Sequence, residues 1–219
     1  MRASLDTNVI IHLYKANMQS ILFDMFKDGI FIYEQIRNVE LENHGKSILD
    51  IVDADITAGK IEIYTDDKLK KQGVYRMFKN YVNENRSLYG AGDLGEVYAI
   101  SLAQTVGTYS LITDDTKQGG PYMSLMQFEG DIKPFNFADI LILRYLLGIA
   151  DARQTVMDFD AINESSDLKW SLKSQLVKFI KRFMRDPYNE DDIVWFEQWT
   201  KKHGVDAIAD FKTLRDVMR

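Results

Sequence analysis

The chain is organised from its beginning, Ser4-Leu5-Asp6-Thr7-Asn8-Val9-Ile10-Ile11. A short apolar segment ends in an acid. Thr7 and Asn8 follow, and their side chains can accept hydrogen bonds from the free N–H groups of a first helical turn. The closely spaced apolar residues after them predict the buried face of a helix. We therefore predict a strand, an acid at its carboxyl end and then a helix. In open α/β sheets, ligands bind at this kind of junction.

Strands alternate with helical segments over roughly the first two thirds of the chain. We expect buried strands at Ile30–Tyr33 and Tyr109–Ile112, and an edge strand at Ile61–Tyr64. A last strand is expected at 132–135, at an edge of the sheet if Pro134 lies within it. Such alternation implies parallel strands joined by right-handed crossovers. The fold class is therefore α/β.

The last third of the chain has helical patterns alone, at roughly 152–163, 166–186, 189–203 and 205–218. We therefore divide the chain into a domain at 1–149 and a helical C-terminal extension at 150–219. The segment Lys169–Arg185 contains bases but no acids. It is either a helix that grips an RNA backbone or a core-packing helix with a solvated basic face.

Composition narrows the class of protein. The 219 residues are 46% hydrophobic and 27% charged, which is ordinary for a soluble globular chain. There is no apolar run long enough to span a membrane, and Asp6 comes too early for a signal peptide. We therefore expect a cytoplasmic protein without membrane contact. The net charge of −6 gives no general attraction to nucleic acid, but it is compatible with an acidic site that grips phosphates through metal ions.

Acidic side chains lie where this layout brings strand ends and helix starts together. They are Asp6 after the first strand, Asp114 and Asp115 after the fourth, Asp93 and Glu96 in one helical turn, and Glu40 and Glu42 after the second strand. Converging carboxylates repel one another unless a cation lies among them. The chain has no Cys, and its three His are scattered, so the cation must be a hard ion held by oxygens, such as Mg²⁺ or Mn²⁺.

A site of this kind can hydrolyse phosphodiester bonds. Metal ions activate a bound water and stabilise the leaving oxygen, while the carboxylates position the ions. In-line attack would leave a 5′-phosphate and a 3′-hydroxyl. Thr113 and Asn8 are candidates to orient ligands or water. The alternative for Asp6 is a simple helix cap, and for His12 a surface or packed position.

Four motifs, in order, resemble those of the PIN-domain nucleases. They are Asp6-Thr7-Asn8-Val9-Ile10, Val39-Glu40-Leu41, Gly90-Ala91-Gly92-Asp93 and Leu111-Ile112-Thr113-Asp114-Asp115. The resemblance covers residues 1–149. It implies a five-stranded parallel sheet in the order 3-2-1-4-5, with helices on both faces, and an Mg²⁺ or Mn²⁺ site that cleaves single-stranded RNA. Many members are toxins of toxin–antitoxin pairs, inhibited by a protein partner that inserts into the site. A homodimer is a further expectation.

The resemblance leaves some assignments open. The metal ligands are taken as Asp6, Glu40, Asp93 and Asp115, with Glu96 and Asp114 as alternatives or additional ligands. Glu42 is close to Glu40 in the sequence. The rival function is a non-catalytic PIN-like module that binds RNA or protein. A phosphatase with Asp6 as nucleophile is disfavoured because Asn8 stands where that chemistry needs a second Asp.

Overall fold

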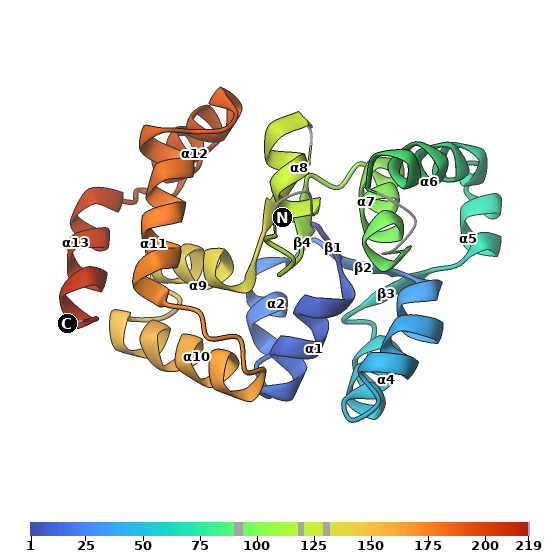
Figure 1. Ribbon diagram of the computed structural model, residues 1–219, viewed down its shortest axis with the longest axis horizontal. Helices are drawn as coiled ribbons and strands as arrows, with labels where there is room; N and C mark the ends of the chain where they lie inside the picture. Colours follow the sequence, from blue (N-terminus) through green and yellow to red (C-terminus); the bar gives the residue numbers. More distant parts are fainter. Residues whose placement is uncertain (90–93, 118–120, 129–131, 219) are drawn as a thin grey trace. The chain divides into compact units, whose positions relative to one another are not determined.

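The chain divides into two compact units, Met1–Asn136 and Phe137–Arg219 (Figure 1). The computed structural model describes residues 1–89, 94–117, 121–128 and 132–218. We expected the division after residue 149. The helix Phe137–Leu146 instead contacts the two helices that follow it, Ala152–Ser165 and Leu172–Ile180, and the division therefore falls after residue 136.

The first unit is built on a five-stranded sheet. Its strands are β1 (Ala3–Leu5), β2 (Ile30–Tyr33), β3 (Glu62–Tyr64), β4 (Ser110–Ile112) and β5 (Lys133–Phe135). All four pairings are parallel, and the order is β3-β2-β1-β4-β5. The predicted α/β fold and the strand order 3-2-1-4-5 are confirmed. As expected, β5 lies at an edge and contains Pro134, whose missing N–H excludes it from a central strand.

Helices connect these strands. They are α1 (Thr7–Lys15), α2 (Ser20–Met25), the π-helix η1 (Ile36–Leu41), α3 (Glu42–His44), α4 (Leu49–Thr57), α5 (Asp66–Lys71), α6 (Tyr75–Tyr89), α7 (Leu94–Val106) and α8 (Pro121–Phe128). α7 contacts β1, β2 and β4. The buried hydroxyl of Ser4 in β1 donates to the carbonyl of Ala99 in α7 at 2.9 Å. The second turn of α7 is thereby held against the central strands.

An aromatic cluster packs α6 and α7 on the sheet. The ring of Tyr33 in β2 lies 4.7 Å from that of Phe78 and 4.9 Å from that of Tyr98, measured between centroids. β2 is buried along its whole length, which is typical of a central parallel strand. It begins after Gly29, whose φ of 135° is strained for residues with a side chain, and an added Cβ would lie 2.7 Å from the Phe31 ring.

The second unit is helical throughout its described residues. It contains α9 (Phe137–Leu146), α10 (Ala152–Ser165), α11 (Leu172–Ile180), the π-helix η2 (Lys181–Arg185), α12 (Glu190–His203) and α13 (Ala207–Val217). Asn189 caps α12 through its side chain. The rings of Phe179, Phe183 and Phe196 pack together in the core. Buried Arg182 forms an ion pair with buried Asp192 at 2.6 Å.

The predicted helix at 166–186 is wrong in its first part, because α11 begins only at Leu172. Asp167 and Lys169 have φ of 50° and 54°, outside the helical range. The side chain of Asn163 holds this loop by accepting from Trp170 N at 2.8 Å and donating to Trp170 O at 3.2 Å. In the rest of the segment, Leu176, Phe179 and Phe183 are buried, which agrees with a core-packing helix.

No helix among the described residues combines the length and the apolar character needed to cross a membrane.

Candidate functional site

The two central strands place Asp6 and Thr113 side by side. β1 ends at Leu5 and β4 at Ile112, and these residues are partners in the parallel register. The backbone N–H of Asp6 donates to the Ile112 carbonyl at 2.9 Å. The residues that follow the two strands therefore lie at the carboxyl edge of the sheet, as expected for parallel strands of this order.

Asp6 is buried and its carboxylate is bound on both oxygens. The side chain caps α1 by accepting from Thr7 N at 2.7 Å through Oδ1. The Thr113 hydroxyl donates to Oδ2 at 2.9 Å. Hydrogen bonds to a charged acceptor are stronger than neutral ones, and they offset the loss of hydration on burial. Asp6 is thus both a helix cap and the start of a larger polar arrangement.

Thr113 connects Asp6 to Asp115. Its Oγ1 also accepts from the backbone N–H of Asp115 at 3.2 Å. One fully buried hydroxyl therefore fixes the position of two of the predicted site acids. The expectation that Thr113 orients other site residues agrees with this geometry.

Asp115 lies between a base and a second acid. Lys117 Nζ is 2.5 Å from its Oδ2, and Lys117 N donates to its Oδ1 at 3.2 Å. Burial raises the pKa of Asp115, but the hydrogen bonds with Lys117 and with the Glu96 side chain outweigh burial, and the pKa lies below its usual value. Glu96 and Asp115 therefore interact, and two bare carboxylates in contact would repel each other.

Glu40 reaches the same region from η1. A Cβ added to Gly95 would lie 3.2 Å from Thr7 Oγ1 and 3.3 Å from Glu40 Cγ, so both side chains lie close to Gly95. Gly95 directly precedes Glu96 in the first turn of α7. Glu42, the alternative to Glu40, instead forms an ion pair with Arg37 at 2.7 Å. π-Helical turns are rare and frequently occur at functional sites.

Asp114 faces a different partner from Asp115. Its Oδ2 lies 2.6 Å from Nδ1 of His12, which is on α1. Its side chain has no exposed surface. His12, which we expected at the surface or in the packing, is partly buried and pairs with this buried carboxyl group. Among these contacts, the Thr113 hydroxyl binds Asp6 and Asp115, whereas Asp114 contacts His12.

The acids form a chain of contacts and not a closed cluster. Among residues 1–89, 94–117, 121–128 and 132–218, no three or more His, Asp or Glu side chains are grouped so that they could hold a metal ion. Asp93, one of the predicted ligands, lies outside the described residues. The described structure links Asp6 to Asp115 through Thr113, and Asp115 to Glu96. It places Glu40 next to Gly95, which precedes Glu96.

Thr7 also lies in this region, although the sequence assigned it only a role at the start of a helix. It is 6% exposed, and in the described part of the chain its Oγ1 has no hydrogen-bond partner. A buried hydroxyl without a partner costs about 1–3 kcal/mol. Its position next to Glu40 and Gly95 makes it a candidate to bind a ligand or water. The sequence signal that could have identified Thr7 is its position directly after the strand-end acid Asp6.

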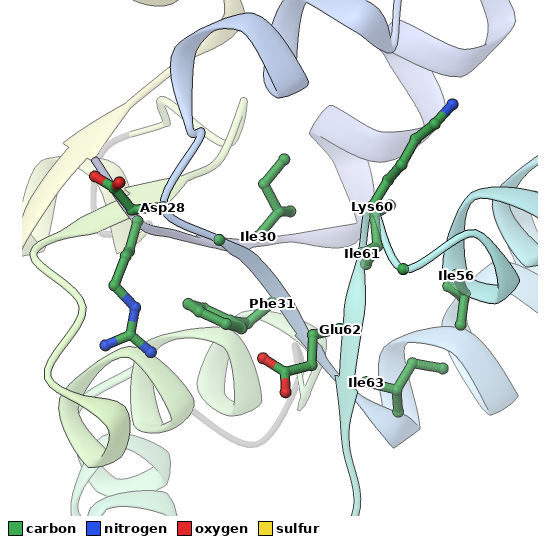
Figure 2. Close-up of a pocket in the computed structure, with 11 residues that line it drawn as sticks. Asp28, Ile30, Phe31, Ile56, Lys60, Ile61, Glu62 and Ile63 are labelled. Carbon is green, nitrogen blue, oxygen red and sulfur yellow. The ribbon is translucent and has the colours of Figure 1, made fainter.

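A pocket of about 560 Å³ lies at the end of the sheet opposite to the acids (Figure 2). It lies at the amino ends of β2 and β3, and none of the predicted site residues lines it. Its charged lining is mixed: Asp28 and Glu62 against Arg2 and Lys60. The acids and this pocket are therefore separate features of the first unit.

Comparison of the chain with protein-family models, with curated proteins and with solved structures found no match.

Proposed function

We propose that the chain is a metal-dependent endoribonuclease that hydrolyses phosphodiester bonds in single-stranded RNA. The proposal depends mainly on one observation, the buried Thr113 hydroxyl that binds both the carboxylate of Asp6 and the backbone N–H of Asp115 at the carboxyl edge of the sheet. The order of the acidic motifs, which resembles that of PIN-domain nucleases, supports the same function.

The donor oxygens suit a hard divalent cation by their chemistry, although the described residues do not group three of these side chains around one point. Asp6, Glu40, Glu96 and Asp115 offer oxygens alone, which Mg²⁺ and Mn²⁺ prefer, and Asp93 is proposed as a further ligand. When bound, such an ion would lower the pKa of a water molecule and neutralise charge on the phosphate. Thr113 holds the carboxylate of Asp6 and the backbone of Asp115 in place.

The protein residues have distinct roles in this proposal. Asp6, buried and bound on both oxygens, supplies a fixed negative charge at the strand end. Lys117 balances the charge of Asp115 through its ion pair. Thr7 Oγ1, buried without a partner in the described residues, offers a polar contact to a water or to the substrate. We also propose a cytoplasmic location and the role of a toxin with a protein inhibitor, both from the sequence.

The direct test measures metal binding and cleavage in parallel. Mn²⁺ binding to the full chain is followed by electron paramagnetic resonance, and cleavage of a labelled single-stranded RNA is followed with and without Mn²⁺. Asp6→Asn keeps the size of the side chain and removes its charge. We expect this variant to lose at least about tenfold in Mn²⁺ affinity and most of the cleavage. The cleavage products should carry 5′-phosphates.

Asp50→Asn is the matched control, because Asp50 is an exposed acid on α4 outside the site. It should bind Mn²⁺ and cleave RNA like the unaltered protein. Cleavage that Asp6→Asn retains in full would refute the proposal. RNA binding without cleavage, unaffected by Mn²⁺, would instead indicate the non-catalytic binding module.

A further inference from the structure

An apolar groove runs along the second unit, between α11 with η2 on one side and α13 on the other. Its volume is about 1040 Å³. The floor and walls are formed by aliphatic and aromatic side chains, namely Leu176, Val177, Ile180, Met184, Ile208 and Phe211. None of the residues predicted for the acidic site lies in it, so the groove is a feature independent of the proposed nuclease activity.

Two of the lining residues expose apolar surface to solvent. Val177 on α11 is 52% exposed and Ile208 on α13 is 73% exposed. Leu176 and Phe211 beneath them are buried. Aliphatic side chains that remain in water on both walls of a groove can gain free energy when a partner covers them, at about 25 cal/mol per Å² of apolar surface.

The rim of the groove is basic, although the chain as a whole is acidic. Five bases and two acids line it, a net charge of +3, against −6 for the whole chain. The bases are Lys173, Lys181, Arg185, Lys212 and Arg215, and the acids are Asp186 and Asp206. Within the described residues, none of the five bases has an ion pair. The rim therefore favours an occupant with acidic side chains.

The dimensions suit a short helix. The lining residues of α11 and η2 recur at Lys173, Leu176, Val177, Ile180, Lys181 and Met184, which is the spacing of one helical face over about three turns. A helix laid between two helices contacts both along such faces. The most exposed lining side chains, Val177 and Ile208, are aliphatic, and Phe211 is buried, so the groove suits leucine-type side chains and offers little for the stacking of bases, which favours a protein over an RNA.

We propose that this groove binds an acidic amphipathic helix of a partner protein. The apolar face of that helix would cover Val177 and Ile208, and acidic residues beside that face would pair with the basic rim. This is the helix-in-groove mode of recognition.

The proposal is tested on the full chain with fluorescent peptides of about 14 residues, about four helical turns. The probe set carries Leu, Ile, Met or Phe at i, i+3, i+4, i+7 and Glu on either side. Two comparison sets carry the same residues in scrambled order, or Lys in place of Glu. Binding is measured by fluorescence anisotropy at two salt concentrations. We expect the acidic amphipathic set to bind at least about tenfold more tightly than either comparison set, and more weakly at higher salt.

Substitutions locate the binding. Ile208→Glu and Val177→Glu should each weaken it at least about tenfold, because they add repulsion and remove apolar contact. Val194→Glu is the matched control, since Val194 on α12 is 50% exposed and does not line the groove. It should change the affinity less than about twofold. Circular dichroism of each variant checks that the helices remain folded.

Three results would overturn the proposal. One is the absence of saturable binding by every acidic amphipathic peptide. The second is binding that Ile208→Glu and Val177→Glu leave unchanged. The third is binding of a single-stranded RNA that Lys212→Ala with Arg215→Ala abolishes and Ile208→Glu does not, which would assign the groove to nucleic acid.

Discussion

Thr113→Val removes one hydroxyl group and keeps the branched shape of the side chain. In the folded protein this hydroxyl donates to the buried carboxylate of Asp6 at 2.9 Å and accepts from the N–H of Asp115 at 3.2 Å. Loss of a hydrogen bond to a charged group costs about 1.5–3 kcal/mol, and loss of a neutral one costs about 1 kcal/mol. We therefore expect the free energy of unfolding to fall by about 2.5–4 kcal/mol.

Urea unfolding followed by circular dichroism measures this change. Circular dichroism is preferred because all three Trp lie in the second unit, so their fluorescence does not report on the sheet. Thr105→Val is the matched control: its buried hydroxyl donates at 2.6 Å to the carbonyl of Ser101, one turn earlier in α7. It should cost about 1 kcal/mol or less.

A Thr113→Val variant no less stable than Thr105→Val would refute the view that this hydroxyl holds two site acids. The same variant tests the proposed metal site. Residues that orient metal ligands typically alter metal affinity about 10–100-fold, so Mn²⁺ affinity should fall by that factor. An unchanged Mn²⁺ affinity together with a large loss of stability would show that Thr113 is structural alone.

Three further substitutions probe other parts of the molecule. Gly95→Ala places a methyl group about 3.3 Å from Glu40 Cγ, and we expect about a tenfold loss of Mn²⁺ affinity with retained circular dichroism. Arg182→Met removes a buried ion pair with a carboxylate of α12, and urea unfolding should show a loss of about 3–5 kcal/mol; a loss below about 1 kcal/mol would contradict this. Asp53→Asn tests pH dependence: hydrogen bonds from Arg37 lower the pKa of Asp53, so its stabilisation is present above about pH 4 and disappears as the pH falls through that lowered pKa. Urea unfolding should show a cost of about 0.5–1 kcal/mol at pH 7 that shrinks as the pH falls below about 4, and a cost that stays the same would contradict the assignment.

The order of strands was predictable because each strand has a simple sequence signal. β2 is a continuous apolar run, and Pro134 restricts β5 to an edge. Strand-end acids in a parallel sheet share one edge, and the structure places Asp6 and the backbone of Asp115 on the same Thr113 hydroxyl. Helix boundaries were less predictable. The late start of α11 depends on left-handed φ values at Asp167 and Lys169, which apolar periodicity does not reveal.

The partner of each acid could not be predicted from the sequence. Asp114 and Asp115 are adjacent and chemically identical, yet one pairs with His12 and the other with Lys117 and Glu96. Which partner each acid takes depends on how the turn after β4 directs the two side chains, one toward α1 and the other toward α7. Such an orientation follows from packing, and no motif in the sequence records it.

The hydrogen bond between Thr113 and Asp6 joins residues 107 positions apart. During synthesis the first strand leaves the ribosome long before the strand that completes its pairing, at about 5–20 residues per second. A nascent or prematurely terminated chain that stops before residue 113 has neither Thr113 nor Asp115. The hydrogen-bonded carboxyl edge of the sheet therefore forms only after most of the first unit has been made.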